Sequence, residues 1–477
     1  METYQLPLQE SKTDEESGKL IKLSRQPNHD DILRRLLSEI KPIEFRDILG
    51  LPAEEKIETR HVIVAVVKYL LQIANDKNWG LCQKYDYTYI YNGAYWKQYT
   101  RSDIRKFLCD AAIKMGHPDY EACHFSFSEN LLKQFISYAH LAKPEVQNDK
   151  MLINLQNYTF EFGDSGWIPR TFNPADFLTY QLPFDYNSTA KCPIFDKYLL
   201  KVLPDESSRM VLQEFAGFIF SKLNLEKCLV LTGNGGNGKS VFFNILNALV
   251  GKDNTLNYSL GLFGREYNRA KLTNVLLNYS SERGFDLHPD TFKTLVSGEP
   301  IQAREPYGRS FTICSPVKFI INCNELPKET ENTEAYFRRF LIIPFAIKIS
   351  QEEKDIYLAD KIIRSELPGV FNWALEGLNR IVKQKQFTYC ESSEKAMVEF
   401  RKQADSPQLF IEEYSYQPSD EIRVTLMDLY SEYKDYCKDN KYLPLGKNRF
   451  SQRLETKGFE KIRRNDGTYF CIAKVKV

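Results

Sequence analysis

The sequence lacks the features that would place it among secreted, membrane or zinc-binding proteins. Its ten cysteines form no C-x-x-C pair, and its six histidines make no ligand-spaced cluster with them. We therefore expect reduced thiols, no disulfide framework and no structural zinc. The segment from Met1 to Lys19 is acidic and polar, and the apolar run from Val62 to Ala74 is interrupted by Lys68. This pattern predicts no signal peptide, membrane span or membrane partner, and it indicates the cytoplasm of a bacterial or infected host cell.

A large excess of either charge is also missing. The 64 basic and 63 acidic residues give a formal net charge of +1, so any surface for nucleic acid must be local. With 477 residues the chain is long enough for about two to four domains with sizeable cores.

One glycine-rich motif dominates the sequence. It reads Gly233-Asn234-Gly235-Gly236-Asn237-Gly238-Lys239-Ser240. The apolar run 228–232 precedes it, and 241–250 follows with helical spacing, which is the strand–loop–helix context of a phosphate loop. Backbone N–H groups of 233–241, Val241 included, are predicted to surround the phosphates of ATP, with Lys239 neutralising oxygens and Ser240 holding Mg²⁺.

The region before this motif predicts an α+β domain. Residues 1–30 lack apolar periodicity and suggest a flexible lead-in, whereas 31–49 and 61–74 have helical spacing. Six aromatic residues from Tyr87 to Tyr99 surround Asn92-Gly93, a strong hairpin signal. Such rings could stack on bases, but we favour a structural core for them.

Two further apolar strands follow the glycine motif, and each ends on a polar side chain. The strand 274–280 leads to Glu282, which we predict to activate the attacking water and to help hold Mg²⁺. Position 281 is serine, so only one carboxylate stands at the end of this strand, and metal binding would depend more on Ser240. The strand 317–324 ends at Asn324, whose amide could bond both the γ-phosphate and that water; its simpler interpretation is turn chemistry.

Between these two strands the sequence predicts a hairpin with basic and aromatic side chains. It carries Arg304, Tyr307 and Arg309 around Glu305-Pro306-Tyr307-Gly308. Cations beside an aromatic ring suit the backbone and bases of single-stranded DNA, although a solvated surface hairpin has the same composition.

A pair of arginines, Arg338 and Arg339, precedes the apolar strand 340–345. An arginine supplied by a neighbouring subunit can stabilise the phosphoryl group during its transfer. We assign this role to Arg339, which is nearer to the strand that would hold it.

Taken in order, these motifs resemble the superfamily 3 helicases. The segments Gly298-Glu299 and Asn324-Glu325-Leu326-Pro327 resemble the phage, plasmid and poxvirus primase-helicase branch in particular. The resemblance implies an AAA+-type P-loop core, a homohexamer, and ATP-driven 3′→5′ translocation on single-stranded and forked DNA. Residues 1–84 contain no Asp-x-Asp motif, so we expect primer synthesis elsewhere, with a separate primase or polymerase as a candidate partner.

The chain after the motor predicts a further small domain. From Lys441 to Val477 it has ten basic and three acidic residues, and two helical patterns precede a strand after Asp466-Gly467. This resembles a winged helix, with a charged packing domain as the alternative. We therefore expect a lead-in at 1–30, an α+β domain at 31–200, the motor at 201–400 and a winged-helix-like domain at 406–477.

Two other functions fit parts of this pattern. An initiator or loader would use ATP to control ring assembly without unwinding DNA. A P-loop kinase would need a small-molecule acceptor and no ring.

Overall fold

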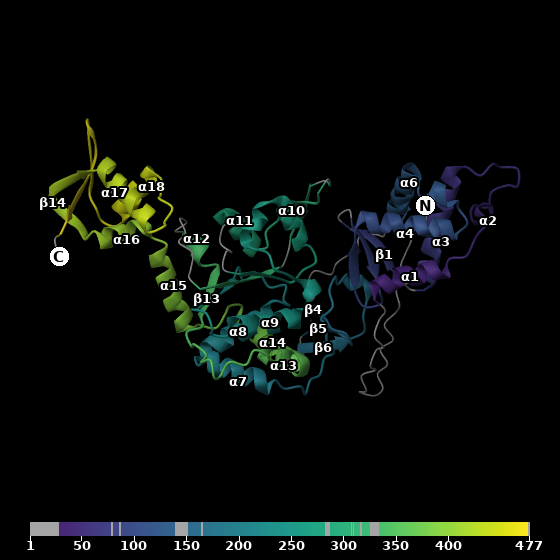
Figure 1. Ribbon diagram of the computed structural model, residues 1–477, viewed down its shortest axis with the longest axis horizontal. Helices are drawn as coiled ribbons and strands as arrows, with labels where there is room; N and C mark the ends of the chain where they lie inside the picture. The colour runs from purple at the N-terminus through teal and green to yellow at the C-terminus, as the bar shows by residue number, and fades with distance from the viewer. Residues whose placement is uncertain are drawn as a thin grey trace. The chain divides into compact units, whose positions relative to one another are not determined.

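The computed structural model describes residues 28–77, 80–84, 87–138, 151–163, 166–281, 287–306, 308, 310–314, 317–324 and 333–475 (Figure 1). The chain divides into two compact units. Unit 1 comprises residues 1–190 and 249–254, and unit 2 comprises residues 191–248 and 255–477. Glu282, Tyr307 and Arg309 lie outside the described residues.

Unit 1 begins with a helical layer around one apolar core. Leu36, Val66, Leu108 and Leu131 each contribute a fully buried or nearly fully buried side chain to that core. A capping box stabilises the start of α4 (Arg101–Lys114), where Thr100 and Asp103 exchange hydrogen bonds. The helices are α1 (His29–Glu39), α2 (Phe45–Leu49), α3 (Thr59–Asp76), α4 (Arg101–Lys114), α5 (Asp119–Ala122) and α6 (Phe125–Tyr138).

Two antiparallel three-stranded sheets complete unit 1. The first contains β1 (Gly80–Lys84), β2 (Tyr87–Tyr91) and β3 (Trp96–Tyr99), and the second contains β4 (Leu152–Asn154), β5 (Thr159–Gly163) and β6 (Gly166–Arg170). The predicted hairpin at Asn92-Gly93 joins β2 to β3, and the Asn92 side chain accepts hydrogen bonds from the N–H groups of the next turn. Tyr89, Tyr91 and Trp96 are buried against Phe177. The aromatic strands therefore form a core, as we favoured.

Unit 2 is built on a five-stranded parallel sheet, which confirms the predicted α/β class. Its spatial order is β13 (Phe340–Pro344), β7 (Cys228–Thr232), β12 (Lys318–Cys323), β9 (Leu277–Ser281) and β8 (Thr255–Leu256). The strand β7 comes first along the chain, yet it lies between β13 and β12. The strand order therefore reverses beside β7, and in open parallel sheets ligands bind at the carboxyl ends of strands at such a point.

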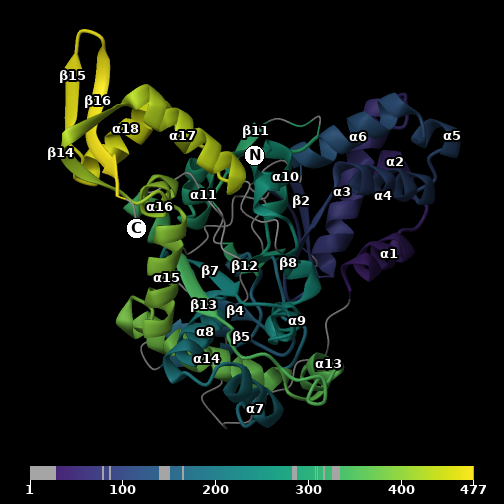
Figure 2. The same ribbon diagram turned by 60° about the vertical axis from the view of Figure 1, so that its left-hand side comes forward.

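Helices cover both faces of this sheet, because alternate residues along each strand point to opposite sides. Figures 1 and 2 show α8 (Glu206–Phe218), α9 (Lys239–Val250) and α14 (Leu367–Gln384) on one side. On the other side lie α10 (Glu266–Arg269) and α11 (Pro289–Val296). The remaining elements around the sheet are α7 (Pro193–Val202), η3 (Leu260–Gly264), η4 (Ala270–Leu272), β10 (Ile301–Arg304), β11 (Ser310–Ile313), α12 (Glu334–Phe337), α13 (Leu358–Ser365) and α15 (Glu391–Gln403).

Two glycines let α8 and α14 pack closely. A Cβ added at Gly377 would lie 2.2 Å from the Gln213 carbonyl oxygen, and one added at Gly217 would lie 2.5 Å from the Ala374 carbonyl oxygen. The same interface buries Glu214 completely, and its carboxylate accepts hydrogen bonds from the Thr388 N–H group and from Arg380. These two helices therefore form a closely packed pair on one side of the sheet.

The C-terminal elements of unit 2 have a core of their own. Around Phe410, Tyr433 and Phe450 pack three helices and a three-stranded sheet of order β14-β16-β15. The elements are α16 (Ser406–Glu413), β14 (Tyr416–Thr425), α17 (Leu426–Asp439), α18 (Lys447–Thr456), β15 (Lys461–Arg464) and β16 (Gly467–Lys474). The two expected helices and the strand after Asp466-Gly467 are present, whereas α16 and β14 were not predicted.

Candidate functional site

The glycine motif forms the connection between β7 and α9. Gly236 and Gly238 have positive φ angles of 82° and 90°, which glycine adopts without strain. At Gly233 an added Cβ would lie 2.3 Å from the Asn237 side chain and 2.4 Å from the Phe345 carbonyl oxygen. A larger residue at 233 would therefore push the loop away from the end of β13.

Asn237 connects the loop to Lys239 and to the chain after β13. Its Nδ2 donates to the Phe345 carbonyl at 2.7 Å, and its Oδ1 accepts from Lys239 Nζ at 3.0 Å. Lys239 Nζ also donates to the Gly233 carbonyl, and only 5% of the Lys239 residue is exposed. On the other side of the loop, the Tyr198 hydroxyl donates to the Gly238 carbonyl at 2.8 Å. The ammonium is thus held inside a loop that is itself fixed from two sides, while Asn234, Gly235 and Gly236 are exposed.

The neighbouring strands end at the same edge of the sheet. Cys323 pairs with Thr232, so Asn324 follows β12 at the level where Gly233 follows β7. Ser281 pairs with Asn322, so β9 also ends here, directly before the undescribed Glu282. The structure therefore brings the glycine loop and Asn324 to one edge, as expected, and Asn324 is exposed there.

A buried amide two residues earlier was not expected. Asn322 Nδ2 donates to the Tyr279 hydroxyl at 2.9 Å. Its Oδ1 is buried and has no hydrogen-bond partner among the described residues. An unpaired buried acceptor has a desolvation cost and often marks a place where water or a ligand binds.

The arginine pair lies at the opposite end of the sheet. Phe340 pairs with Cys228, and the Cys228 N–H group donates to the Arg339 carbonyl, so Arg338 and Arg339 stand where β7 begins. The five residues of β7 separate this edge from the glycine loop by roughly 16 Å. Within one chain the arginines and Lys239 are therefore far apart.

The two arginines differ in exposure. The Arg339 side chain is 6% exposed, and it donates to Ser297 Oγ at 2.8 Å and to the Ala335 carbonyl, beside the Glu226 carboxylate at 3.3 Å. Arg338 is 55% exposed and pairs with Glu226 at 3.0 Å. Arg339 is thus fixed within its own chain, and the assignment of the trans role to it stays a prediction.

Burial shifts the pKa values of basic groups at this edge. It lowers the pKa of the Lys318 ammonium to about 7, while Lys318 Nζ donates to the Leu223 carbonyl at 3.0 Å and lies 4.0 Å from the centre of the Phe218 ring. Burial also lowers the pKa of the Arg339 guanidinium, and the Glu226 carboxylate opposes that shift.

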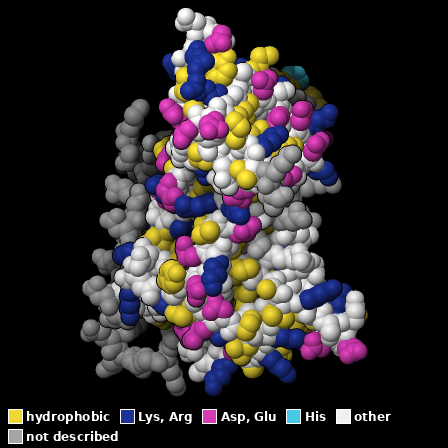
Figure 3. Space-filling view, turned by 90° about the vertical axis from the view of Figure 1, so that its left-hand side faces the viewer, with side chains coloured by type: hydrophobic (Ala, Val, Ile, Leu, Met, Phe, Trp, Pro, Cys, Tyr) yellow, Lys and Arg dark blue, Asp and Glu magenta, His cyan; other side chains and the backbone are white. Residues whose placement is uncertain are grey.

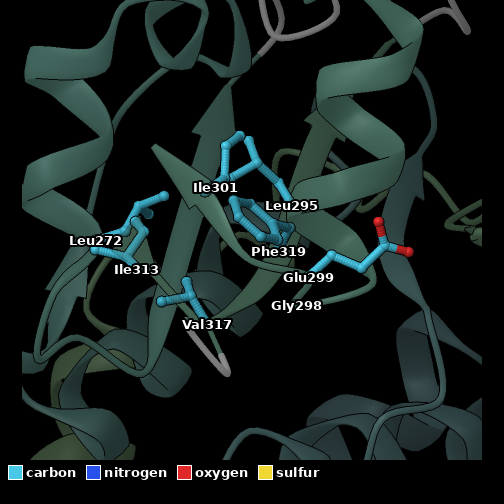
Figure 4. Close-up of a pocket in the computed structure, with 8 residues that line it drawn as sticks. All are labelled: Leu272, Leu295, Gly298, Glu299, Ile301, Ile313, Val317 and Phe319. Atoms are coloured by element: carbon cyan, nitrogen blue, oxygen red, sulfur yellow. The ribbon is translucent and has the colours of Figure 1, made fainter. Parts of the chain in front are cut away.

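The predicted hairpin is present as the antiparallel strands β10 and β11. Ile301 pairs with Ile313 at one end, and Arg304 pairs with Ser310 at the other. Arg304 turns towards α10, where its guanidinium donates to the Tyr267 hydroxyl and lies over the Tyr267 ring. Beneath the hairpin is a small cavity of about 10 Å³. Figure 4 shows its apolar lining, including Leu295 and Phe319, with the Glu299 carboxylate pointing away. Such a volume suits one water molecule, so this cavity is no nucleotide site.

The basic residues of the C-terminal elements differ in how far they are engaged. Arg453 of α18 and Lys457, which directly follows this helix, pair with Asp405 at 2.8 and 3.0 Å, and this carboxylate is 7% exposed. Arg463 and Arg464 on β15 are exposed. Figure 3 shows basic side chains interspersed with acidic ones on the face it presents. The accessible positive charge of this part therefore includes the hairpin β15–β16 and the start of α18, where Lys447 and Arg449 are also exposed.

The described residues contain no group of three or more His, Cys, Asp or Glu side chains arranged to hold a metal ion. Among them, no helix combines the length and apolar character that crossing a membrane requires.

Sequence comparisons match separate segments of the chain to known families. Residues 67–204 match the family described as D5 N terminal like, and residues 402–471 match the family described as Poxvirus D5 protein-like. These matches support a D5-like primase-helicase family for this chain. In this D5-like chain, residues 231–339, which include the glycine loop, match a family of unknown function, DUF5906.

Two viral relatives of this D5-like chain carry helicase names. "Putative helicase 121R" of Invertebrate iridescent virus 3 is 22% identical over 357 residues, which are 65% of this chain and 38% of that protein. "Putative helicase L207/L206" of Acanthamoeba polyphaga mimivirus is 24% identical over 272 residues, which are 51% of this chain and 28% of that protein. The chain thus spans about a third of the length of these relatives. A solved structure, the A form apo structure of NrS-1 C terminal region, is 14% identical and covers 86% of this chain and 99% of its own, with a TM-score of 0.46.

Sequence reasoning missed several residues that contact the glycine loop or the arginine pair. Glu226, which pairs with both arginines, has a positive φ of 51° just before β7. Tyr198 lies forty positions before its partner Gly238. Neither has a local sequence signal, because each acts through a contact between distant segments. From the sequence, Asn237 was predicted only as one member of the glycine loop. Its bond to Lys239 was not predicted, although both residues lie in the same motif.

Proposed function

We propose that this chain is the ATP-driven motor of a replicative DNA helicase from a virus or other mobile element. The observation that carries the proposal is the arrangement at the carboxyl edge of the sheet. The glycine loop, Lys239 and Asn324 meet there beside the point where the strand order reverses, which is where phosphate-binding sheets place their ligand.

The residues at this edge fit a nucleoside triphosphate with Mg²⁺. The loop presents exposed glycine backbone at the start of α9, whose positive end favours an anion. Ser240 is exposed at that helix start and would hold Mg²⁺, with Glu282 as the predicted second group. Bound Mg-ATP would supply the phosphoryl bond whose hydrolysis drives movement.

The chain's own side chains have separate tasks at this site. Lys239, held by Asn237, would donate to phosphate oxygens once it leaves the Gly233 carbonyl. Asn324 would orient the attacking water, and Glu282 would accept its proton. The link from Asn237 to the Phe345 carbonyl would keep the loop in register with β13 while Lys239 changes partners.

A complete site would need two copies of the chain. Because Arg338 and Arg339 lie at the far end of β13, roughly 16 Å from the glycine loop, neither would serve its own Lys239. A head-to-tail ring would bring this edge of one subunit to the glycine loop of the next. We infer a homohexamer in which an arginine of this pair acts in trans on the phosphates of the neighbour. The sequence assigned this role to Arg339, but Arg339 is bonded within its own chain and Arg338 is exposed, so we propose Arg338 for it.

We infer the finer fold and the DNA contacts from the same framework. The core is an AAA+-type P-loop ATPase, and the C-terminal elements form a winged-helix-like domain that binds duplex DNA through the β15–β16 hairpin. The β10–β11 hairpin faces single-stranded DNA, on which the ring moves 3′→5′. A separate primase or polymerase would act on the same DNA.

A single kinetic experiment tests this function. Hydrolysis of ATP by the wild-type chain should require Mg²⁺ and rise when single-stranded DNA is added, and Lys239→Ala should abolish it at unchanged melting temperature. Glu282→Gln should bind ATP yet hydrolyse it at least about 100-fold more slowly. If single-stranded DNA does not change the wild-type hydrolysis rate, or if Lys239→Ala still hydrolyses ATP, the proposed motor function is contradicted.

An initiator or loader remains the second candidate, favoured by the exposed arginines of β15. Such a protein would bind duplex DNA and hydrolyse ATP without separating strands. Strand displacement on a forked substrate distinguishes the two functions.

A further inference from the structure

The segment beside the predicted DNA hairpin is bonded tightly to it. Arg269 Nε and Nη2 donate to the carbonyls of Phe263 and Gly264 at 2.8 and 3.1 Å, and its Nη1 donates to the Gln302 carbonyl on β10 at 2.9 Å. Lys271 pairs with Glu305 at 3.3 Å at the other end. One guanidinium thus closes the turn from η3 into α10 and fastens it to the hairpin. The two segments behave as one rigid element.

Arg304 joins the same two segments through an aromatic ring. Its guanidinium carbon lies 4.9 Å from the centre of the Tyr267 ring, and its Nη2 donates to the Tyr267 hydroxyl. Its Nε lies 3.9 Å from the Glu266 carboxylate. With these three interactions Arg304 fixes the plane of the Tyr267 ring, because a hydroxyl bond and a cation over the face restrict rotation together.

Tyr267 is nevertheless accessible. The residue is 41% exposed, and Leu262, five positions earlier in the chain, is 42% exposed. A ring that is held in one orientation and still open to solvent has little conformational entropy left to lose when something stacks on it.

The charge around Tyr267 is positive. The segment 265–271 and the end of β10 that is bonded to it carry four basic residues and two acidic ones, a net charge of +2: Arg265, Arg269, Lys271 and Arg304 against Glu266 and Glu305. Arg265 is exposed, and among the described residues we find no carboxylate that pairs with it. We call Arg265, Tyr267 and Arg304 the Tyr267 surface.

We propose that the Tyr267 surface binds single-stranded DNA, with Tyr267 stacking on a base and Arg265 contacting the adjacent phosphate. The inference rests on the proposed function, since it places this surface beside the DNA hairpin of the motor. Arg304 becomes a positioning residue that orients Tyr267, rather than the phosphate contact that the sequence suggested. Every base has a face on which a tyrosine can stack, so the surface suits a motor that moves over any sequence.

The test measures the affinity of the whole chain for two fluorescent oligonucleotides. One is a deoxythymidine strand, and the other has the same backbone with abasic sites. The variants are Tyr267→Ala, Tyr267→Phe, Arg265→Ala and Arg304→Gln. The control is Tyr357→Ala, which removes another exposed tyrosine of unit 2. Melting temperatures establish that each variant is folded.

Each variant has a distinct expected result. Tyr267→Ala should weaken binding of the base-containing strand about 5- to 100-fold and leave the abasic strand unaffected. Tyr267→Phe keeps the stacking ring and the cation over it but loses the hydroxyl bond to Arg304, so it should lose less affinity than Tyr267→Ala, and Tyr357→Ala should bind like the wild type. Arg265→Ala should weaken both strands and lower the salt dependence by about 0.7 per subunit contact. The Arg304→Gln change should weaken binding of the base-containing strand when Tyr267 is present. The same change made in a Tyr267→Ala chain should weaken binding less, because Arg304 acts through the ring.

The outcomes separate the two levels of the proposal. If Tyr267→Ala binds both strands as the wild type does, the Tyr267 surface is overturned while the motor stands. If the wild type itself binds neither strand, the proposed function fails first. Equal weakening of both strands by Tyr267→Ala would also contradict stacking, since it would show a loss that does not depend on bases.

Discussion

Replacing each arginine of the pair should separate stability from catalysis. The Arg339→Ala change removes a 6% exposed guanidinium that bonds Ser297, the Ala335 carbonyl and Glu226. Leaving these groups without their cation should cost about 2–4 kcal/mol of unfolding free energy. The Arg338→Ala change removes one ion pair of a 55% exposed side chain, which contributes at most about 1 kcal/mol because water screens it.

The two variants should therefore fail in different ways. Arg338→Ala should unfold in urea near the wild-type midpoint yet lose ATP hydrolysis, because the exposed arginine is the one that can leave Glu226 for a neighbouring subunit. Arg339→Ala should lose both stability and activity. Urea unfolding followed by fluorescence, together with steady-state hydrolysis, measures both quantities on the same samples.

Mixing experiments give the sharper readout. In equal mixtures of Arg338→Ala and Lys239→Ala chains, random hexamers would have an intact Lys239 and a neighbouring intact Arg338 at about one interface in four. About a quarter of wild-type activity should return, although each variant is inactive alone. Two results together would refute this reasoning and restore Arg339 as the trans residue. One is an Arg339→Ala chain as stable as the wild type, and the other is recovered ATP hydrolysis when that chain is mixed with Lys239→Ala.

Three further changes test separate parts of the structure. Gly377→Ala should destabilise the chain by at least about 2 kcal/mol in urea, because its Cβ would lie 2.2 Å from a backbone oxygen, while Gly446→Ala, with open space around it, should not. Burial lowers the pKa of Lys318 to about 7, so the folded chain binds fewer protons than the unfolded chain from there up to about pH 10.5, and its stability should rise with pH over that range. Lys318→Met should flatten that rise; an unchanged slope would mean that the amine is not desolvated. Replacing Arg463 and Arg464 by Ala should weaken duplex binding and lower its salt slope by about 2 at unchanged ATP hydrolysis, and an equal loss of hydrolysis would make the hairpin structural.

Much of the framework could be predicted from local patterns. The glycine loop, the strands that end near Asn324 and Ser281, and the β10–β11 hairpin follow from apolar spacing and turn residues, which depend on neighbours along the chain. The same is true of α17, α18 and the strand β16.

The contacts that shape the site could not be predicted in this way. The burial of Arg339, the ion pairs of Glu226 and the contact of Arg304 with Tyr267 join segments separated by 37 to 113 positions. Such pairings depend on which strands lie side by side, and no residue type signals them. The sequence therefore indicated which groups carry charge but not which of them are already engaged.

The most direct test of the central claim is strand displacement. A forked DNA with a 3′ single-stranded tail is incubated with the chain and Mg-ATP, and release of the labelled strand is followed for the wild type and for Lys239→Ala. We predict release by the wild type only, dependent on ATP and lost when the tail is moved to the 5′ end. Hydrolysis of ATP by the wild type without any strand release would contradict it.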